Sequence, residues 1–306
     1  MLTRRRRRLH PNSRFSTVLP LSLCALAFVN CRNDSAGPAP IAGVIAFDSR
    51  AGDGFQDVFV SNADGSGRTN LTNSPGEDAT PSWSPDGQMI AFQSDRELNV
   101  DIFVMRADGS AQTNLTKTIG ADAQPAWSPD GRKIAFVSNR VGNIDVFVMN
   151  ADGSAVLQLT TNGASDSYPA WSPDGGKIAF NSNRDGASAS EIYVMNSDGT
   201  AQINLTNNPT ADDAYPDWSP DGQKIAFSSD RDGRSEIYVM NTDGSGVVRV
   251  TQDRVFDAFP AWSPDGQKIA FVSEGGGGTS YQILVINADG SGRRVITAGR
   301  SVRWRP

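Results

Sequence analysis

Residues 127–140 read Trp-Ser-Pro-Asp-Gly-Arg-Lys-Ile-Ala-Phe-Val-Ser-Asn-Arg, and close copies of this stretch recur along the chain. An altered last copy surrounds Trp304, and successive copies lie 44, 44, 47, 44 and 42 residues apart. A nearly fixed period of this length indicates a protein built from one repeated supersecondary unit. The intact Trp-Ser-Pro-Asp-Gly copies begin at Trp83, Trp127, Trp171, Trp218 and Trp262.

Each repeat contains four short segments, A to D, that favour β-strands. β-Branched and aromatic residues fill them, and no helical period appears. Examples are 125–128 for A, 133–138 for B, 236–241 for C, and 205–206 at the end of D. Ser-Pro-Asp-Gly between A and B favours a tight turn, because Pro presets φ, Asp bonds its own backbone and Gly accepts a positive φ.

The ends of the chain indicate how the repeats close into a ring. The first copy starts at its B segment (44–47), and the last copy stops after its A segment at Trp304. Segment B occurs six times, around Ile45, Ile90, Ile134, Ile178, Ile225 and Ile269. The sequence therefore predicts an all-β fold for residues 41–306: a six-bladed β-propeller of four-stranded antiparallel blades, closed by the C-terminal strand joining the N-terminal blade.

The N-terminal residues have the pattern of an export signal. Five consecutive arginines (4–8) precede a 12-residue apolar run (18–29), which is too short to span a bilayer. We expect residues 1–30 to be a signal peptide of the lipoprotein type, Cys31 to carry the lipid, and residues 31–40 to be a tether. The alternative is cleavage after residues 25–27, which gives a soluble exported protein with one free thiol.

Charge restricts the possible partners. Residues 1–30 hold six arginines and no acid, so the other residues carry a net charge of −12. An acidic body repels nucleic acid and anionic lipid, so we expect no nucleic-acid partner and membrane contact through the lipid anchor alone. Arg32 gives no inner-membrane retention signal, which favours the outer membrane facing the periplasm. We also expect a monomer.

The repeat resembles a known family. Trp-Ser-Pro-Asp-Gly-x-Lys-Ile-Ala-Phe-x-Ser-[Asn/Asp]-Arg, followed by Ile-[Phe/Tyr]-Val-Met-Asn-x-Asp-Gly, is similar to the WD40-like repeat of the TolB propeller. The resemblance covers about residues 41–306 and implies the TolB propeller fold. TolB carries an α/β domain before its propeller, whereas about ten residues separate Cys31 from the first blade here.

The residue types argue against catalysis. His10, the sole histidine, lies in the signal segment, which removes Ser-His-Asp, Cys-His and histidine-ligated metal sites from the exported body. We expect no enzyme activity, no cofactor and no metal site. Carboxylates, arginines and tyrosines remain as a possible basis for activity on a glycan.

An aspartate precedes each Trp-Ser-Pro-Asp-Gly tryptophan by five residues, and these aspartates are the candidate binding site. They fall just before the innermost strands, so we expect them to ring one mouth of the central channel. One interpretation is an Asx-type turn; the other is a carboxylate ring that attracts a cation or a basic group of a partner. The five are Asp78, Asp122, Asp166, Asp213 and Asp257, and Gly299 takes the sixth position.

A second series consists of an arginine after segment B and an acid at the start of segment C. We expect a salt bridge between the two across the B–C hairpin. The arginines are Arg50, Arg96, Arg140, Arg184 and Arg231, and the acids are Asp57, Asp101, Asp145, Glu191 and Glu236. The last copy has Glu274 and Gln282 instead and lacks the pair.

These features favour a binding or scaffold protein of the cell envelope that contacts a protein or peptide through the channel-mouth face. The alternative is a carbohydrate-binding or carbohydrate-processing propeller, for which aromatic residues around the mouth are required. Tyr168, Tyr215 and Phe259 occupy suitable positions, although they would serve equally as a hydrophobic wedge between blades. A purely structural module is the third possibility.

Overall fold

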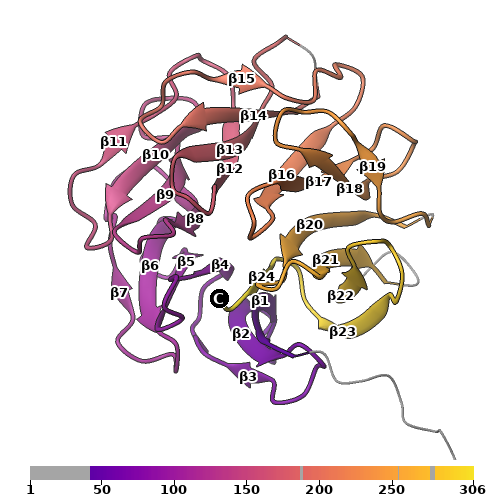
Figure 1. The fold of residues 1–306 in the computed structure, drawn as a ribbon. Coiled ribbons are helices and arrows are strands. Elements are labelled where there is room, and N and C mark those ends of the chain that lie inside the picture. The colour runs from indigo at the N-terminus through magenta and orange to yellow at the C-terminus, as the bar shows by residue number, and fades with distance from the viewer. Residues whose placement is uncertain (1–41, 187–188, 254, 276–279) are drawn as a thin grey trace, which may run out of the picture. The chain divides into compact units, whose positions relative to one another are not determined.

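Figure 1 shows the computed structural model, which describes residues 42–186, 189–253, 255–275 and 280–306. These residues form strands and turns, and none of them belongs to a helix that could cross a membrane. The 24 strands make six four-stranded sheets arranged around a central axis. The predicted all-β propeller is confirmed. The predicted signal peptide, the tether and Cys31 lie outside the described residues.

In each blade the strands run in order from the axis to the rim, as A, B, C and D. Blade 1 contains β24 (Val302–Trp304), β1 (Val44–Arg50), β2 (Gln56–Asn62) and β3 (Thr69–Asn70). Blade 2 contains β4 (Asp78–Trp83), β5 (Met89–Ser94), β6 (Asp101–Arg106) and β7 (Thr113–Asn114). Blade 3 contains β8 (Asp122–Trp127), β9 (Lys133–Ser138), β10 (Asp145–Asn150) and β11 (Leu157–Gln158).

The other three blades repeat this order. Blade 4 contains β12 (Asp166–Trp171), β13 (Lys177–Ser182), β14 (Glu191–Asn196) and β15 (Ile203–Asn204). Blade 5 contains β16 (Asp213–Trp218), β17 (Lys224–Ser229), β18 (Glu236–Asn241) and β19 (Val248–Arg249). Blade 6 contains β20 (Asp257–Trp262), β21 (Lys268–Glu274), β22 (Tyr281–Asn287) and β23 (Arg294–Ala298).

The C-terminal strand closes the ring as the sequence predicts. β24 pairs antiparallel with β1, placing Ile45 opposite Trp304 and Phe47 opposite Val302. The first and last strands of the propeller therefore share one sheet. No disulfide is needed for closure, since separating the strands would expose unpaired backbone edges.

The A–B turns form as their sequence predicts. In blade 3 the Ser128 hydroxyl donates to Asp130 Oδ1 at 2.6 Å, and the same oxygen accepts from the Arg132 backbone N–H at 3.0 Å. Gly131 takes a φ of 69°, which a side chain would strain. Each turn aspartate thus serves its own loop.

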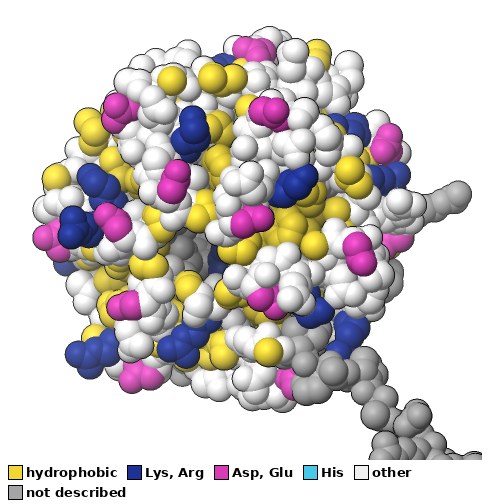
Figure 2. All heavy atoms as spheres, viewed as in Figure 1, with side chains coloured by type: hydrophobic (Ala, Val, Ile, Leu, Met, Phe, Trp, Pro, Cys, Tyr) yellow, Lys and Arg dark blue, Asp and Glu magenta, His cyan; other side chains and the backbone are white. Residues whose placement is uncertain are grey.

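The hydrophobic core is divided among the blade interfaces. Six buried clusters each combine residues of two neighbouring blades, so both faces of every sheet are covered. One fully buried phenylalanine from each B strand anchors them, and each contributes about 2–3 kcal/mol through burial. They are Phe47, Phe92, Phe136, Phe180, Phe227 and Phe271. Figure 2 shows one face of the ring, with acidic and basic side chains interspersed around the central opening.

Candidate functional site

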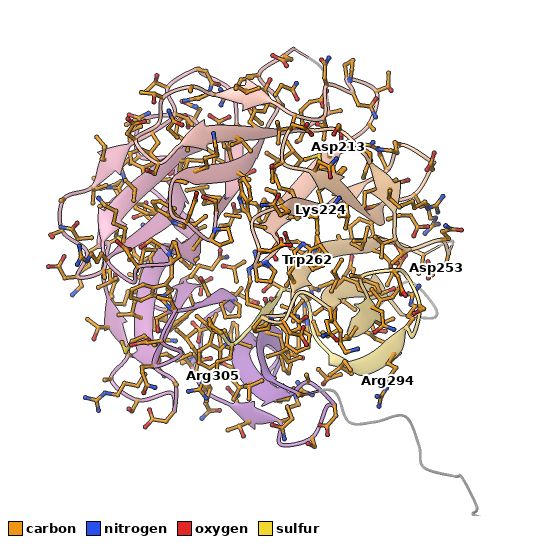
Figure 3. All side chains as sticks on the ribbon, viewed as in Figure 1. Asp213, Lys224, Asp253, Trp262, Arg294 and Arg305 are labelled. Carbon is orange, nitrogen blue, oxygen red and sulfur yellow. The ribbon has the colours of Figure 1, made fainter. Side chains whose placement is uncertain are left out.

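The five predicted aspartates begin the innermost strands of blades 2 to 6, and their side chains are fully buried. In four blades the arginine of the B–C hairpin binds the aspartate of the same blade. Arg140 Nη2 lies 2.8 Å from both carboxylate oxygens of Asp122, and Arg231 Nη2 lies 3.0 Å from both oxygens of Asp213, which Figure 3 labels. The other pairs are Arg96–Asp78 at 2.7 Å and Arg184–Asp166 at 2.9 Å.

Burial and pairing act on these carboxylates in opposite directions. Burial raises the pKa of Asp213, while hydrogen bonds from Ser229 and Arg231 oppose the rise. Burial likewise raises the pKa of Asp78, against hydrogen bonds from Arg96 and Ser94. A buried charge without a partner costs several kcal/mol, so the arginines are needed to keep these aspartates in the fold.

The predicted salt bridge across the B–C hairpin does not form. The acids that open the C strands bind side chains near strand D instead. In blade 2, Asp101 accepts from the Thr116 hydroxyl at 3.2 Å and from the Asn114 amide at 2.9 Å. In blade 5, Glu236 accepts from Thr251. The sequence analysis identified the charged residues correctly, but it paired the arginines with the wrong acids. The arginines bind the aspartates of strand A instead of the acids of strand C.

Blades 1 and 6 complete this pattern with arginines that the sequence analysis missed. Arg50 donates to the Gly54 carbonyl rather than to an acid. The place beside the buried phenylalanine is taken by Arg68, 5.7 Å from the Phe47 ring centre, and by Arg293, 5.3 Å from that of Phe271. Both follow the same Asn-Ala-Asp-Gly-Ser-Gly hexapeptide, which was a usable signal.

A ring of strained residues follows the aspartates. Two positions after each of them, a non-glycine residue takes a left-handed φ of 49–59°, at a register shift in the A–B pairing. Such a conformation costs about 1–3 kcal/mol per residue and is frequent at binding sites. The residues are Thr80, Gln124, Tyr168, Tyr215 and Phe259, and Ser301 is the blade 1 equivalent.

These six side chains, which we call the mouth ring, divide into two halves. Blades 1 to 3 supply serine, threonine and glutamine, whereas blades 4 to 6 supply two tyrosines and a phenylalanine. The ring centres of Tyr168 and Tyr215 lie 4.5 Å apart, and those of Tyr215 and Phe259 lie 3.8 Å apart. One half of the mouth ring is therefore polar and the other aromatic.

Five of the six mouth-ring residues, all except Gln124, line a cavity of about 300 Å³, which we call the axial cavity. Asp48 lies in its wall and accepts hydrogen bonds from the backbone N–H groups of Ser301, at 3.2 Å, and Thr80, at 3.3 Å. Burial raises the pKa of Asp48. The lining residues are Asp48, Gln56, Ala79, Thr80, Tyr168, Tyr215, Phe256, Phe259, Val272, Tyr281, Arg300 and Ser301.

The five predicted aspartates are absent from this lining. Each of them is buried and binds an arginine or a hydroxyl within its blade, so none of them is part of the axial cavity. Their role in recognition stays an untested prediction, which this placement disfavours. Of the aromatic candidates, Tyr168, Tyr215 and Phe259 reach the cavity, whereas the sequence analysis missed Asp48, Phe256 and Tyr281.

A second cavity of about 290 Å³ adjoins the axial cavity, and Tyr215 and Phe256 line both. Asp212 and Asp230 lie on its wall. Arg234, on the same wall, is 3.4 Å from Glu274 of blade 6. Tyr215 and Phe256 are therefore shared by the axial cavity and a second cavity that is lined mainly by residues of blade 5.

One acidic group has the spacing of a metal site. Carboxylate oxygens of Glu236, Asp253 and Asp257 lie within 4.8 Å of one another, and Figure 3 labels Asp253. Arg249 binds Glu236 at 2.6 Å, and Arg293 contacts Asp253 and approaches Asp257 to 3.5 Å. Burial, with Glu236 nearby, raises the pKa of Asp257 to about 6. Two guanidinium groups already supply the positive charge here, so the arrangement is an ion-pair network.

The repeat region matches the profile of a known protein family. Residues 97–169, 114–190 and 164–303 match the profile of the TolB β-propeller domain, and together they cover more than half of the chain. The chain belongs to the TolB β-propeller domain family. A search of curated protein sequences gives no match.

Solved structures share the TolB-type fold at low sequence identity. TolB from Acinetobacter baumannii is 23% identical with a TM-score of 0.76, over 88% of this chain and 68% of that one. A putative TolB from Agrobacterium tumefaciens is 22% identical with a TM-score of 0.70, over 88% and 100%. An oligogalacturonate lyase from Vibrio parahaemolyticus is 14% identical with a TM-score of 0.54, over 84% and 74%. At these identities the likeness concerns the fold.

Proposed function

We propose that this protein is an exported envelope protein that binds a protein or peptide at the mouth ring and the axial cavity. The observation that carries the proposal is the cavity of about 300 Å³, which combines five aromatic rings with the polar groups of Asp48, Gln56 and Arg300. Mostly apolar cavities with a few polar groups are the usual ligand sites of proteins. Left-handed backbone at the mouth ring supports a site retained at a cost in stability.

The test is a random hexapeptide library panned on the wild-type protein, with affinities of the selected peptides measured by fluorescence anisotropy. Tyr215→Ala removes a wall that both cavities share and should weaken binding at least tenfold. Val248→Ala, at an exposed position on the rim, is the control and should bind as wild type does. Equal affinities of both variants, with unchanged melting curves, would exclude the axial cavity as the site.

The same peptides test the predicted role of the aspartates. If the aspartates recognise the ligand, replacing Asp166, Asp213 and Asp257 by Asn abolishes binding. We expect the triple variant to retain the peptide as long as it remains folded, because these side chains lie outside the cavity lining.

A carbohydrate ligand is the second candidate, and the aromatic half of the mouth ring favours it. Aromatic faces suit the apolar faces of sugar rings, and Arg300 suits an acidic sugar. The oligogalacturonate lyase shares the fold, and its name gives an acidic oligosaccharide as its substrate. Calorimetry with neutral and acidic oligosaccharides separates the candidates. If this protein binds a sugar and selects no peptide, the carbohydrate candidate is favoured. We propose no enzyme activity for either.

We further propose that Cys31 carries a lipid that anchors the protein to the outer membrane, facing the periplasm. The basic stretch and the apolar run before Cys31 support this proposal. Changing Cys31 to Ser should move the protein from the membrane fraction to the soluble periplasmic fraction. Changing Cys24 to Ser, within the apolar run, is the matched control and should leave the protein membrane-bound. Equal membrane association of all three forms would refute lipid anchoring at Cys31.

A further inference from the structure

The boundary between blade 6 and blade 1, which we call the seam, is the place where the two ends of the repeat array meet. In blade 1, Gly299 stands where the other five blades have the buried aspartate, so blade 1 lacks the ion pair between strand A and the B–C hairpin that four blades contain. A different set of contacts must hold the residues that lead into β24 against the rest of blade 1.

A cluster around Asp48 supplies these contacts. Asp48 Oδ1 accepts from the Ser301 backbone N–H at 3.2 Å and also from the Ser301 hydroxyl. The Asp48 carbonyl accepts from the Arg300 backbone N–H at 2.9 Å. With its amide oriented to suit its neighbours, Gln56 donates to Asp48 Oδ2 at 2.7 Å and accepts from Arg300 Nη1 at 3.3 Å. These four residues, the Asp48 cluster, join the last residues of the chain to the first blade.

The Asp48 cluster is also a wall of the axial cavity. All four of its members line the cavity, and Tyr281 and Phe259 of blade 6 line the side across the seam. The Arg300 guanidinium lies 5.2 Å from the ring centre of Tyr281, so it spans the seam at this point. Movement of residues 300–301 away from blade 1 would therefore dismantle the cavity.

β24 has the features of the innermost strand that detaches most readily from its blade. β24 has three residues, whereas every other A strand has six.

Packing at the seam is tight around Gly299. A Cβ atom on Gly299 would lie 2.8 Å from Phe47 Cδ2 and 3.0 Å from Ile283 Cγ1. Gly299 itself does not line the cavity, so a side chain there would disturb closure without touching a ligand.

We propose that ligand binding in the axial cavity and docking of the C-terminal strand are coupled: the ligand binds the closed ring, and a bound ligand holds β24 against β1. The inference rests on the proposed function for the existence of a ligand. Coupling of this kind is reciprocal, so the factor by which opening weakens binding equals the factor by which binding suppresses opening.

The test uses the full chain and the tightest hexapeptide from the panning experiment. Hydrogen–deuterium exchange reports opening of the seam through residues 299–306, with 122–127 of blade 3 as the internal reference. Gly299→Ala should speed exchange at 299–306 at least tenfold and weaken the peptide by a similar factor. Gly52→Ala is the control, because nothing lies within 4 Å of a Cβ atom there. In the wild type, saturating peptide should slow exchange at 299–306 far more than at 122–127.

Three results would overturn the coupling. The first is faster exchange in Gly299→Ala with unchanged peptide affinity. The second is a wild-type seam that the peptide does not protect beyond the blade 3 reference. The third is exchange at 299–306 that neither Gly299→Ala nor Asp48→Asn accelerates. If Gly299→Ala does not fold, the coupling is tested by exchange at 299–306 in Asp48→Asn and by protection of the wild-type seam by the peptide. A failure of the proposed function is recognised separately, because wild type then selects no cavity-dependent peptide.

Discussion

Asp217 shows how one residue departs from the repeat. It precedes the tryptophan of β16, at a position where blades 3, 4 and 6 carry alanine. Its Oδ2 accepts from the Trp262 backbone N–H at 2.7 Å, which links blade 5 to blade 6. Burial raises its pKa to about 6, although Arg303 opposes the rise. The acid therefore costs stability in its ionised form while it supplies an interblade hydrogen bond.

The pKa of Asp217 predicts a pH dependence of stability. The unfolded carboxyl titrates near 3.8 and the folded one near 6, so the folded protein holds the extra proton between these values. The free energy of unfolding therefore falls as pH rises from about 4 to 6 through this group. Asp217→Asn keeps the acceptor and should be about 3 kcal/mol more stable than wild type at pH 7.5, but similar at pH 4. Urea denaturation at both pH values measures this, and a pH-independent difference would contradict it.

At the scale of the element, the B–C hairpin contains an arginine whose acidic partner the sequence pattern could not predict. An arginine that follows strand B lies between strand A on one side and strand C on the other, and both carry acids. Arg140 folds back over the Phe136 ring, 5.4 Å from its centre, and reaches Asp122 of strand A. The order of charges along the chain could not predict this choice, because it depends on which carboxylate is left in the interior without other donors.

Breaking one such pair should be costly. Arg140→Met keeps the apolar stem over Phe136 but leaves Asp122 buried with a single hydroxyl donor, Thr118. We expect a loss of about 3 kcal/mol in the free energy of unfolding. The double variant with Asp122→Asn should recover most of the loss, because it removes the buried charge. Urea denaturation of the two variants decides, and equal losses in both would show that the ion pair is not the cause.

The candidate site was harder to predict than its scaffold. Tyr168, Tyr215 and Phe259 were identified because they hold one position of a visible repeat. Asp48, Phe256, Tyr281 and Arg300 break the repeat, and pairing of β24 with β1 brings Arg300 beside Asp48. A pattern read from one repeat at a time cannot show which departures from it meet in space.

At the scale of the molecule, the sequence predicted the fold, the number of blades and the mode of closure. Turn residues, strand residues and the repeat period all agree with one architecture, and agreement of this kind is typical of a foldable sequence. The unequal ends of the repeat array were informative, because the N-terminal copy lacks the strand that the C-terminal copy has in excess.

Closure predicts a large effect for a small deletion. Removing residues 301–306 takes away β24, including the fully buried Val302 and the largely buried Trp304, and exposes the edge of β1. Loss of a buried tryptophan alone costs about 3–5 kcal/mol, so the melting temperature should fall by about 10 °C or more. Removal of the exposed Pro306 alone is the control. A melting curve unchanged by the longer deletion would exclude a closing role for β24.

The division of the mouth ring into a polar and an aromatic half has a consequence for symmetry. Six identical blades would present the same surface six times, and a ligand on the axis could rotate among six equivalent poses. Here Ser301, Thr80 and Gln124 face one side, and Tyr168, Tyr215 and Phe259 face the other. A ligand with one apolar edge has a single matching pose, and it gives up a rotational degeneracy worth roughly 1 kcal/mol. The partner is therefore held in one orientation about the propeller axis, so any group attached to it always projects over the same blades.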